Sequence, residues 1–295
     1  MIDVCNNNLI ILQGQSQPLI NLEKALSKMH TTTMEKRLKQ YLFFIPTTAL
    51  LLSCSDAGKK YEEVEQTKIC SMIFIDKSVS VNINKKFINE KYTKVINQLI
   101  DENVKAKGDK LAVYFVHENT GKGKAAEVVC RTEKGNTSGA SSTDSEAIST
   151  EYTMSLDKER SIFKKIVFAQ LSSQNTSASK NNTDLLAALP LIDKEIAKGY
   201  NVKVYFLSDM VESMNAPNRR DFHANPPVDD AAAVGWARED AVGLKSTLPN
   251  IGLAQIFIAK PFEPTASRKK NNPAISAYWQ RLFMELGVSA EVVEL

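Results

Sequence analysis

Uninterrupted apolar runs alternate along the chain with segments whose apolar residues recur at helical spacing. The run 68–75 (KICSMIFI) is rich in β-branched residues and stops at Asp76, which predicts a buried central strand. Residues 87–106 carry their apolar side chains at helical spacing and predict an amphipathic helix. Further strands are predicted at 111–117, 125–132, 202–207, 252–258 and 288–293, and further helices at 156–171, 183–198, 230–248 and 273–286.

This alternation predicts a three-layer, doubly wound α/β domain with a mostly parallel sheet and helices on both faces. A short polar turn, 118–124, joins two of the strands, so one antiparallel edge strand is expected. The small polar residues of 134–150 predict a flexible loop. One domain, residues 70–295, accounts for all of these elements.

Residues 34–53 have the pattern of an export signal. Three basic residues precede the uncharged run 41–53, which is too short for a bilayer span of about 20 residues. A buried N-terminal helix is the alternative, and Pro46 in the middle of the run argues against it.

The end of this segment, Leu51-Leu52-Ser53-Cys54, is similar to the lipobox of bacterial lipoproteins. That resemblance implies lipid on the sulfur of Cys54 and a membrane-anchored lipoprotein of the cell envelope, with the outer membrane favoured by Ser55. Residues 54–69 are then a polar tether. Translation is expected to start at Met34, which makes residues 1–33 an upstream extension without structure.

Charge narrows the class of partner. The net charge is +3, from 37 basic and 34 acidic residues that are interleaved along the chain. The sequence has no long basic block and no basic-aromatic pattern, so a nucleic-acid partner is not expected.

Oxygen-bearing side chains follow the predicted strands at one edge of the sheet. The segment Asp76-Lys77-Ser78-Val79-Ser80 follows the first strand, Asp209 follows a later one, and Thr183 heads the helix before that later strand. Ligands of open α/β sheets bind at this edge, where the strand order reverses. Such hard oxygen donors suit Mg²⁺, or else Mn²⁺ or Ca²⁺, and leave one position for a carboxylate from a protein partner. Taken singly, the serines and Thr183 could equally be helix N-caps, and Asp209 a turn residue.

Together, Asp76-x-Ser78-x-Ser80, Thr183 and Asp209 resemble the metal-ion-dependent adhesion site of von Willebrand A-type domains, in chain order and in placement. The resemblance covers about residues 70–295. It implies that Ser78, Ser80 and Thr183 bind the metal directly and that Asp76 and Asp209 act through water. It also implies recognition of a protein or surface ligand without catalysis.

Three residues depart from the family pattern. Val79 stands where many members have a small residue, and Met210 stands where many have glycine. Lys77 places a cation beside the site, so it either points away or weakens metal binding.

Two other functions remain open. A metal-dependent hydrolase or phosphatase could use Asp76 as its nucleophile, although Ser78 stands where such enzymes have a second carboxylate. His117 and His223 do not lie in a catalytic motif. The third function is that of a structural periplasmic protein without a metal site.

Two expectations follow from the topology. The long loop 211–229, with Arg219, Arg220, Phe222 and His223, is either a specificity surface or a solvated connector. In the family's strand order, one strand separates Cys70 from Cys130, which puts them roughly 9–10 Å apart. A disulfide needs Cα atoms within about 7 Å, so two free thiols are expected.

Overall fold

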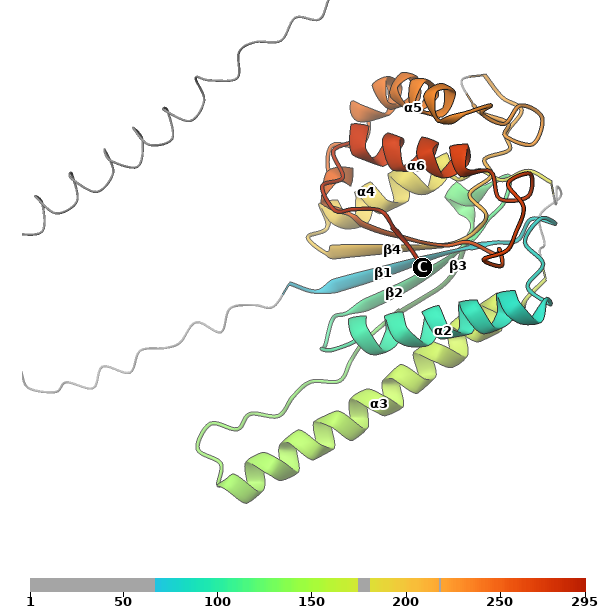
Figure 1. The fold of residues 1–295 in the computed structure, drawn as a ribbon. Helices are drawn as coiled ribbons and strands as arrows, with labels where there is room; N and C mark the ends of the chain where they lie inside the picture. Colours follow the sequence, from blue (N-terminus) through green and yellow to red (C-terminus); the bar gives the residue numbers. More distant parts are fainter. Residues whose placement is uncertain (1–66, 175–180, 218) are drawn as a thin grey trace, which may run out of the picture. The chain divides into compact units, whose positions relative to one another are not determined.

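The computed structural model describes residues 67–174, 181–217 and 219–295 (Figure 1). The predicted extension, the signal segment, the lipid acceptor Cys54 and most of the tether lie outside these residues. Within the described part of the chain, no helix combines the length and the hydrophobicity needed to cross a bilayer.

The sheet has the strand order β3-β2-β1-β4-β5-β6. Neighbouring strands are parallel except for β3, which runs antiparallel to β2 at one edge. This confirms the predicted fold class. The strands are β1 (Ile69–Asp76), β2 (Lys110–Val116), β3 (Lys124–Val129), β4 (Asn201–Leu207), β5 (Gln255–Ala259) and β6 (Val293–Glu294).

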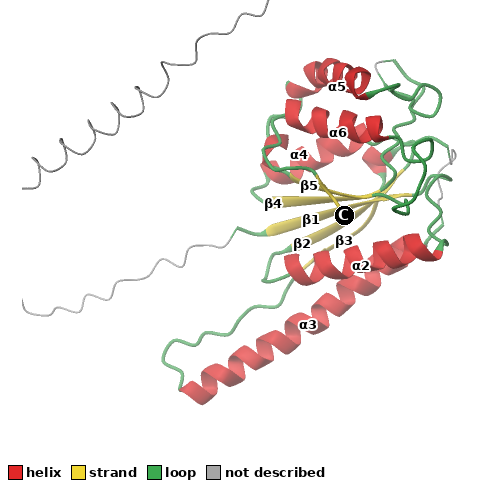
Figure 2. Ribbon diagram, in the orientation of Figure 1, coloured by secondary structure: helices red, strands yellow, loops and turns green. Residues whose placement is uncertain are grey.

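Helices cover both faces of the sheet (Figure 2). On one face lie α2 (Lys86–Asn103) and α3 (Ser142–Ser172), and on the other lie α4 (Leu189–Ala197), α5 (Asp230–Lys245) and α6 (Pro273–Glu285). Three short 3₁₀ turns connect them: η1 (Thr120–Lys122), η2 (Leu186–Ala188) and η3 (Ile251–Leu253).

The central strand β1 belongs to both hydrophobic cores. Met72 and Phe74 pack into the core beneath α4 and α6, whereas Ile73 and Ile75 pack into the core beneath α2 and α3. Successive side chains of a strand point to opposite faces, so a strand buried on both sides is largely apolar. This is why β1 lacks a regular polar alternation, with Ser71 its one polar side chain before Asp76.

The predicted loop 134–150 is wrong from residue 142 onward, because α3 begins there. Ser141 is its N-cap: the hydroxyl accepts the Asp144 N–H and donates to the Asp144 carboxylate at 2.8 Å. Serine, threonine and aspartate are common both in loops and at helix starts, so composition alone does not separate the two. The last predicted strand, 288–293, is also shorter than expected, since β6 pairs only at Val293–Glu294.

The strand order fixes where a ligand can bind. The chain moves outward from β1 through β2 in one direction and from β4 through β5 in the other. The carboxyl ends of β1 and β4 therefore flank the point at which the order reverses. Asp76 and Asp209 stand at these two ends.

Candidate functional site

Asp76 is the anchor of the loop after β1. It is 0% exposed, and both carboxylate oxygens accept hydrogen bonds: Oδ1 from the Ser78 N–H at 2.8 Å and Oδ2 from the Ser208 hydroxyl at 2.6 Å. The Ser78 and Ser80 hydroxyl oxygens are 2.8 Å apart. Sequence reasoning missed Ser208, although its place at the carboxyl end of β4 is a signal that could have identified it.

Asp209 joins this cluster from β4. Its carboxylate accepts the Val211 N–H at 3.1 Å and also interacts with the Ser80 side chain. The contacts of Ser78 with Asp76, of Ser78 with Ser80 and of Ser80 with Asp209 therefore bring four of the five predicted residues together. The N-cap alternative for the two serines is wrong, because the N-cap of α2 is Lys85.

Met210, directly after Asp209, has an unusual backbone conformation. Met210 has φ of 63°, the left-handed region that glycine adopts without strain. Its N–H donates to the Ser208 hydroxyl at 2.9 Å, and its carbonyl accepts the Trp279 indole N–H at 2.7 Å. These two bonds and the burial of the methionine side chain hold the conformation. Asp209 is thereby connected to α6.

The two carboxyl groups of the site, those of Asp76 and Asp209, are both buried. Burial raises the pKa of Asp76 and that of Asp209, and for Asp76 the neighbouring Asp209 carboxylate raises the pKa further. The Tyr92 hydroxyl on α2 is also buried, and both carboxylates raise its pKa. It has no hydrogen-bond partner among the described residues. The cluster thus contains two buried carboxyl groups and one unsatisfied hydroxyl.

Thr183 lies at the same edge of the sheet, but it is positioned by backbone pairing and not by the start of a helix. Its backbone pairs with Ser213 through two hydrogen bonds of 3.1 and 2.9 Å, and the Asp184 N–H donates to the His117 carbonyl at 3.1 Å. Thr183 is therefore held between the segments that follow β2 and β4, and it is buried. The expectation that it caps a helix is wrong, because α4 begins only at Leu189, after η2.

A buried ion-pair cluster holds this threonine segment. The Glu212 carboxylate is 0% exposed and accepts the N–H groups of Leu185 at 2.6 Å and Leu186 at 3.3 Å. The Arg219 guanidinium hydrogen-bonds to both Glu212 and Asp184. We call Asp184, Glu212 and Arg219 the Arg219 clamp. Sequence reasoning missed Glu212, for which the local pattern offers no signal.

Part of the segment 211–229 packs against the domain. Arg220 forms ion pairs with Asp240 and Glu239, and Phe222, only 3% exposed, stacks against Trp236. Phe222 is therefore buried in the domain, and the side chains of Arg219 and Arg220 are held in ion pairs and only partly exposed. The loop remains exposed at residues 215–217 and 223–226. Of the four side chains considered for a specificity surface, only His223 is exposed.

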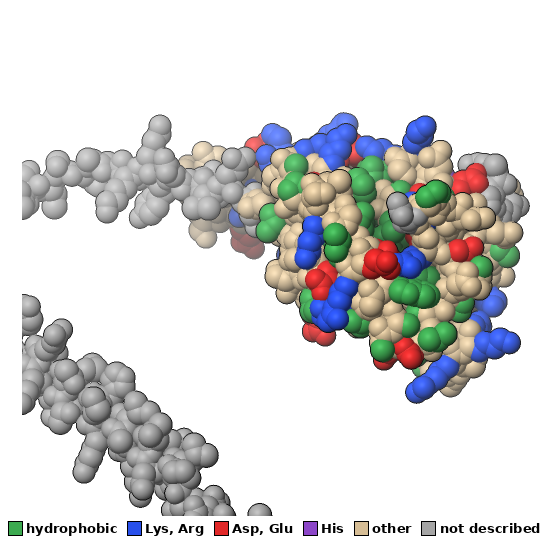
Figure 3. Space-filling view, turned by 90° about the horizontal axis from the view of Figure 1, so that it is seen from above, with side chains coloured by type: hydrophobic (Ala, Val, Ile, Leu, Met, Phe, Trp, Pro, Cys, Tyr) green, Lys and Arg blue, Asp and Glu red, His purple; other side chains and the backbone are tan. Residues whose placement is uncertain are grey.

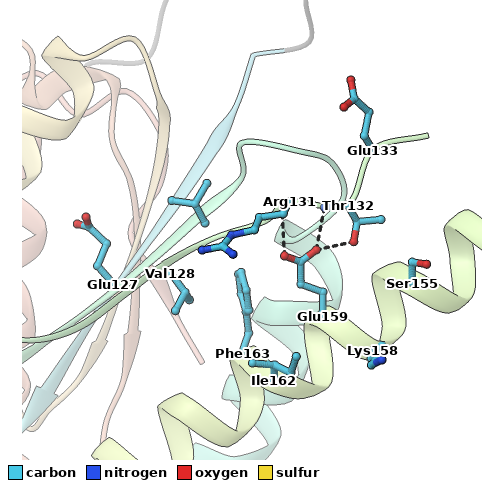
Figure 4. A pocket seen from close by; sticks show the side chains of 11 residues that line it. Glu127, Val128, Arg131, Thr132, Glu133, Ser155, Lys158, Glu159, Ile162 and Phe163 are labelled. Atoms are coloured by element: carbon cyan, nitrogen blue, oxygen red, sulfur yellow. Dashed lines mark hydrogen bonds between the residues drawn. The ribbon is translucent and has the colours of Figure 1, made fainter. Parts of the chain in front are cut away.

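A separate pocket lies between β3 and α3 (Figure 4). In it the Glu159 carboxylate accepts the N–H groups of Arg131 at 2.7 Å and Thr132 at 2.9 Å, so it fastens the segment after β3 to α3. Within the described residues, no group of three or more His, Cys, Asp or Glu side chains is arranged to hold a metal. The site at Asp76 differs from such groups because three of its five proposed ligand residues, Ser78, Ser80 and Thr183, are hydroxyl residues.

The cysteines and the surface charges can also be compared with what the sequence predicts. Cys70 and Cys130 are both free, as predicted, and both are buried. β2 lies between β1, which contains Cys70, and β3, which ends just before Cys130. The face shown in Figure 3 carries both acidic and basic side chains among uncharged ones.

No family model and no curated protein matches the chain. Solved structures with a similar fold include proximal thread matrix protein 1 from the mussel byssus, at 11% identity and TM-score 0.34 over 75% of this chain and 46% of that one. The manganese-loaded TRAP protein of Plasmodium vivax matches at 12% and 0.33, over 70% and 62%. The von Willebrand factor type A structure from Catenulispora acidiphila matches at 14% and 0.34, over 75% and 42%.

This chain spans less than two thirds of each of those chains. The fold described above rests on the strand order and layers of the chain itself. The matches carry no argument about fold or function.

Proposed function

We propose that the chain is a ligand-binding domain that depends on a divalent cation. In this proposal Ser78, Ser80 and Thr183 bind Mg²⁺ directly, and Asp76 and Asp209 bind it through water; Mn²⁺ or Ca²⁺ could take its place. A carboxylate from a protein or surface ligand completes the coordination. The site then works by recognition, with no catalytic step.

The observation that carries the proposal is the pair of buried carboxylates at the point where the strand order reverses. Two anions in a buried site repel each other and lose their hydration, and a divalent cation offsets both costs. The nearest basic residue in the sequence, Lys77, directs its ammonium group to main-chain carbonyls at the end of α3. The unsatisfied Tyr92 hydroxyl beside the carboxylates also fits a site that takes up a hydrated cation.

The structure favours neither alternative. A nucleophilic Asp76 must reach a substrate, yet its carboxylate is fully buried and accepts hydrogen bonds at both oxygens. A structural protein without a metal would keep two neighbouring buried carboxyl groups whose mutual repulsion is offset only by hydrogen bonds from neutral groups.

The cation site is tested by thermal unfolding of the full chain with and without millimolar Mg²⁺, Mn²⁺ or Ca²⁺. A cation at about 100 times its Kd stabilises the native state by about 2.7 kcal/mol. We expect this gain to vanish in Asp76→Asn and in Ser78→Ala. Asp101→Asn, which removes an exposed carboxylate on α2, is the matched control and should keep it. If none of the three cations stabilises the wild-type chain, the proposal is refuted.

We also propose that lipid on Cys54 anchors this domain in the cell envelope, with the outer membrane favoured. The support is the order of basic, apolar and small residues before Cys54. Cys54→Ala should move the protein from the membrane fraction to the soluble fraction.

Pulldown of partner proteins with and without a chelator then shows whether ligand binding needs the cation.

A further inference from the structure

Lys77 lies between two proposed cation ligands, Asp76 and Ser78. We propose that Lys77 is a positioning residue of the cation site, which ties the loop after β1 to the carboxyl end of α3. Cation binding and the order of the last turn of α3 then depend on each other. This inference rests on the proposed function.

The ammonium group occupies a pocket formed by the end of α3. Lys77 Nζ donates to the main-chain carbonyls of Gln170 at 2.9 Å, Leu171 at 2.7 Å and Ser173 at 2.8 Å. It also lies 5.0 Å from the centre of the Phe115 ring on β2. The side chain of Lys77 is buried despite its charge, being 8% exposed. An ammonium has three N–H donors, and three carbonyl oxygens receive them.

Lys77 places a positive charge at the carboxyl end of α3, where α3 has no basic residue of its own. The last carbonyls of a helix have no partner within the helix, and the helix dipole places partial negative charge there. Helices often carry a basic residue in the last turn for this reason, but α3 has none in that turn. Lys77 provides the cation from a position 93 residues earlier in the chain.

Lys77 is also fixed at its main chain. Its N–H donates to the carbonyl of Val116, the last residue of β2, at 3.3 Å. Side chain and main chain together determine the direction of the peptide groups on both sides of Lys77. Those peptide groups lead to the Asp76 carboxylate and the Ser78 hydroxyl, whose relative placement sets the geometry of the cation site.

Simple electrostatics predicts the opposite effect from the positioning role. A positive charge beside a cation site repels the cation, so its removal should tighten binding. If Lys77 holds the loop in place, its removal should weaken binding. The sign of the change in metal affinity therefore separates the two effects.

The test measures Mg²⁺ binding to the full chain by isothermal titration calorimetry, with Mg²⁺ alone as the probe. Lys77→Met should weaken the affinity by about tenfold, the lower end of the range for residues that orient metal ligands. Lys85→Met removes an exposed positive charge from the same loop and should leave the affinity unchanged. Equal or tighter binding by Lys77→Met overturns the inference.

The two proposals fail in different ways. If the wild-type chain does not bind Mg²⁺, Mn²⁺ or Ca²⁺, both are wrong. If the wild-type chain binds one of them and Lys77→Met binds it equally well, only the role of Lys77 is wrong.

Hydrogen exchange of the wild-type chain provides a second readout, which does not require the variant to fold. Coupling between two sites is reciprocal, so Mg²⁺ should slow amide exchange over the last two turns of α3 and its C-cap, residues 167–173. Exchange at the start of α3, residues 142–148, should not change and serves as the internal control. Exchange at 167–173 that does not respond to Mg²⁺, in a chain that binds it, overturns the inference.

Discussion

Replacement of Arg219 by methionine tests whether the Arg219 clamp holds the threonine segment. In the wild type the guanidinium bonds to the carboxylates of Glu212 and Asp184. Methionine keeps much of the apolar volume and removes the charge and the donors. Glu212, which is fully buried, then keeps only the N–H groups of Leu185 and Leu186 as partners.

The expected cost follows from the burial of Glu212. Removal of one partner from a buried ion pair destabilises a protein by about 3–5 kcal/mol, because an uncompensated charge stays behind. Arg219 is 21% exposed and Glu212 keeps its backbone partners, so the lower end applies. We expect a loss of about 3 kcal/mol in the free energy of unfolding at pH 8.

The loss should depend on pH with a definite sign. Burial already raises the pKa of Glu212 from 4.5 to about 7, and Arg219 lowers that pKa, so the variant raises it further. Above the unfolded pKa of 4.5, the native state holds a proton that the unfolded chain has lost, so stability falls as the pH rises through this window. The difference between wild type and variant should therefore be larger at pH 8 than at pH 5.5.

Urea denaturation at both pH values measures these free energies. The double variant Arg219→Met/Glu212→Gln removes the stranded charge and should recover most of the loss at pH 8. A loss below about 1 kcal/mol, the value for an exposed pair, would show that the clamp contributes little. A double variant no more stable than the single variant would also refute the reasoning.

Two further predictions concern stability and reactivity. Burial raises the pKa of the Cys70 and Cys130 thiols to about 12 each, so a thiol reagent at pH 8 should label neither in the folded chain and both after unfolding, as mass spectrometry of labelled peptides can show. Gly123→Ala would place a Cβ 2.4 Å from the Phe115 carbonyl oxygen and should cost about 2 kcal/mol in denaturant unfolding. Gly121→Ala, with open space around the new Cβ, should be neutral, and an equal cost for both variants would contradict this.

The sequence predicts the sheet and the main part of the site because both follow from local patterns. An apolar run buried on both faces identifies β1, and its abrupt end places Asp76 at the carboxyl edge. Asp209 follows from the same reasoning at β4. Once two parallel strands are neighbours, the residues that follow them meet without further information.

The parts that the sequence does not predict depend on distant contacts. Thr183 takes its position from Ser213 and from the Arg219 clamp, and no local pattern reveals that Glu212 reaches Leu185, 27 residues away. The direction of Lys77 is equally hidden, because the end of α3 forms its pocket. In each case a polar side chain is satisfied by a segment that only the folded chain brings near.

The length of α3 has a mechanical consequence. Its 31 residues extend over about 46 Å, against about 26 Å for the eight residues of β1. The buried side chains of α3 begin only at Leu156, and its first turns project past the end of the sheet at which the described chain enters (Figure 1). A tilt of about 5° around the end held by Lys77 would move Ser142 by roughly 4 Å, by the geometry of a rigid helix of this length. The length of the helix thus amplifies small changes of angle at its carboxyl end. A spin label at its amino end would report small movements of the loop after β1 from the opposite side of the protein.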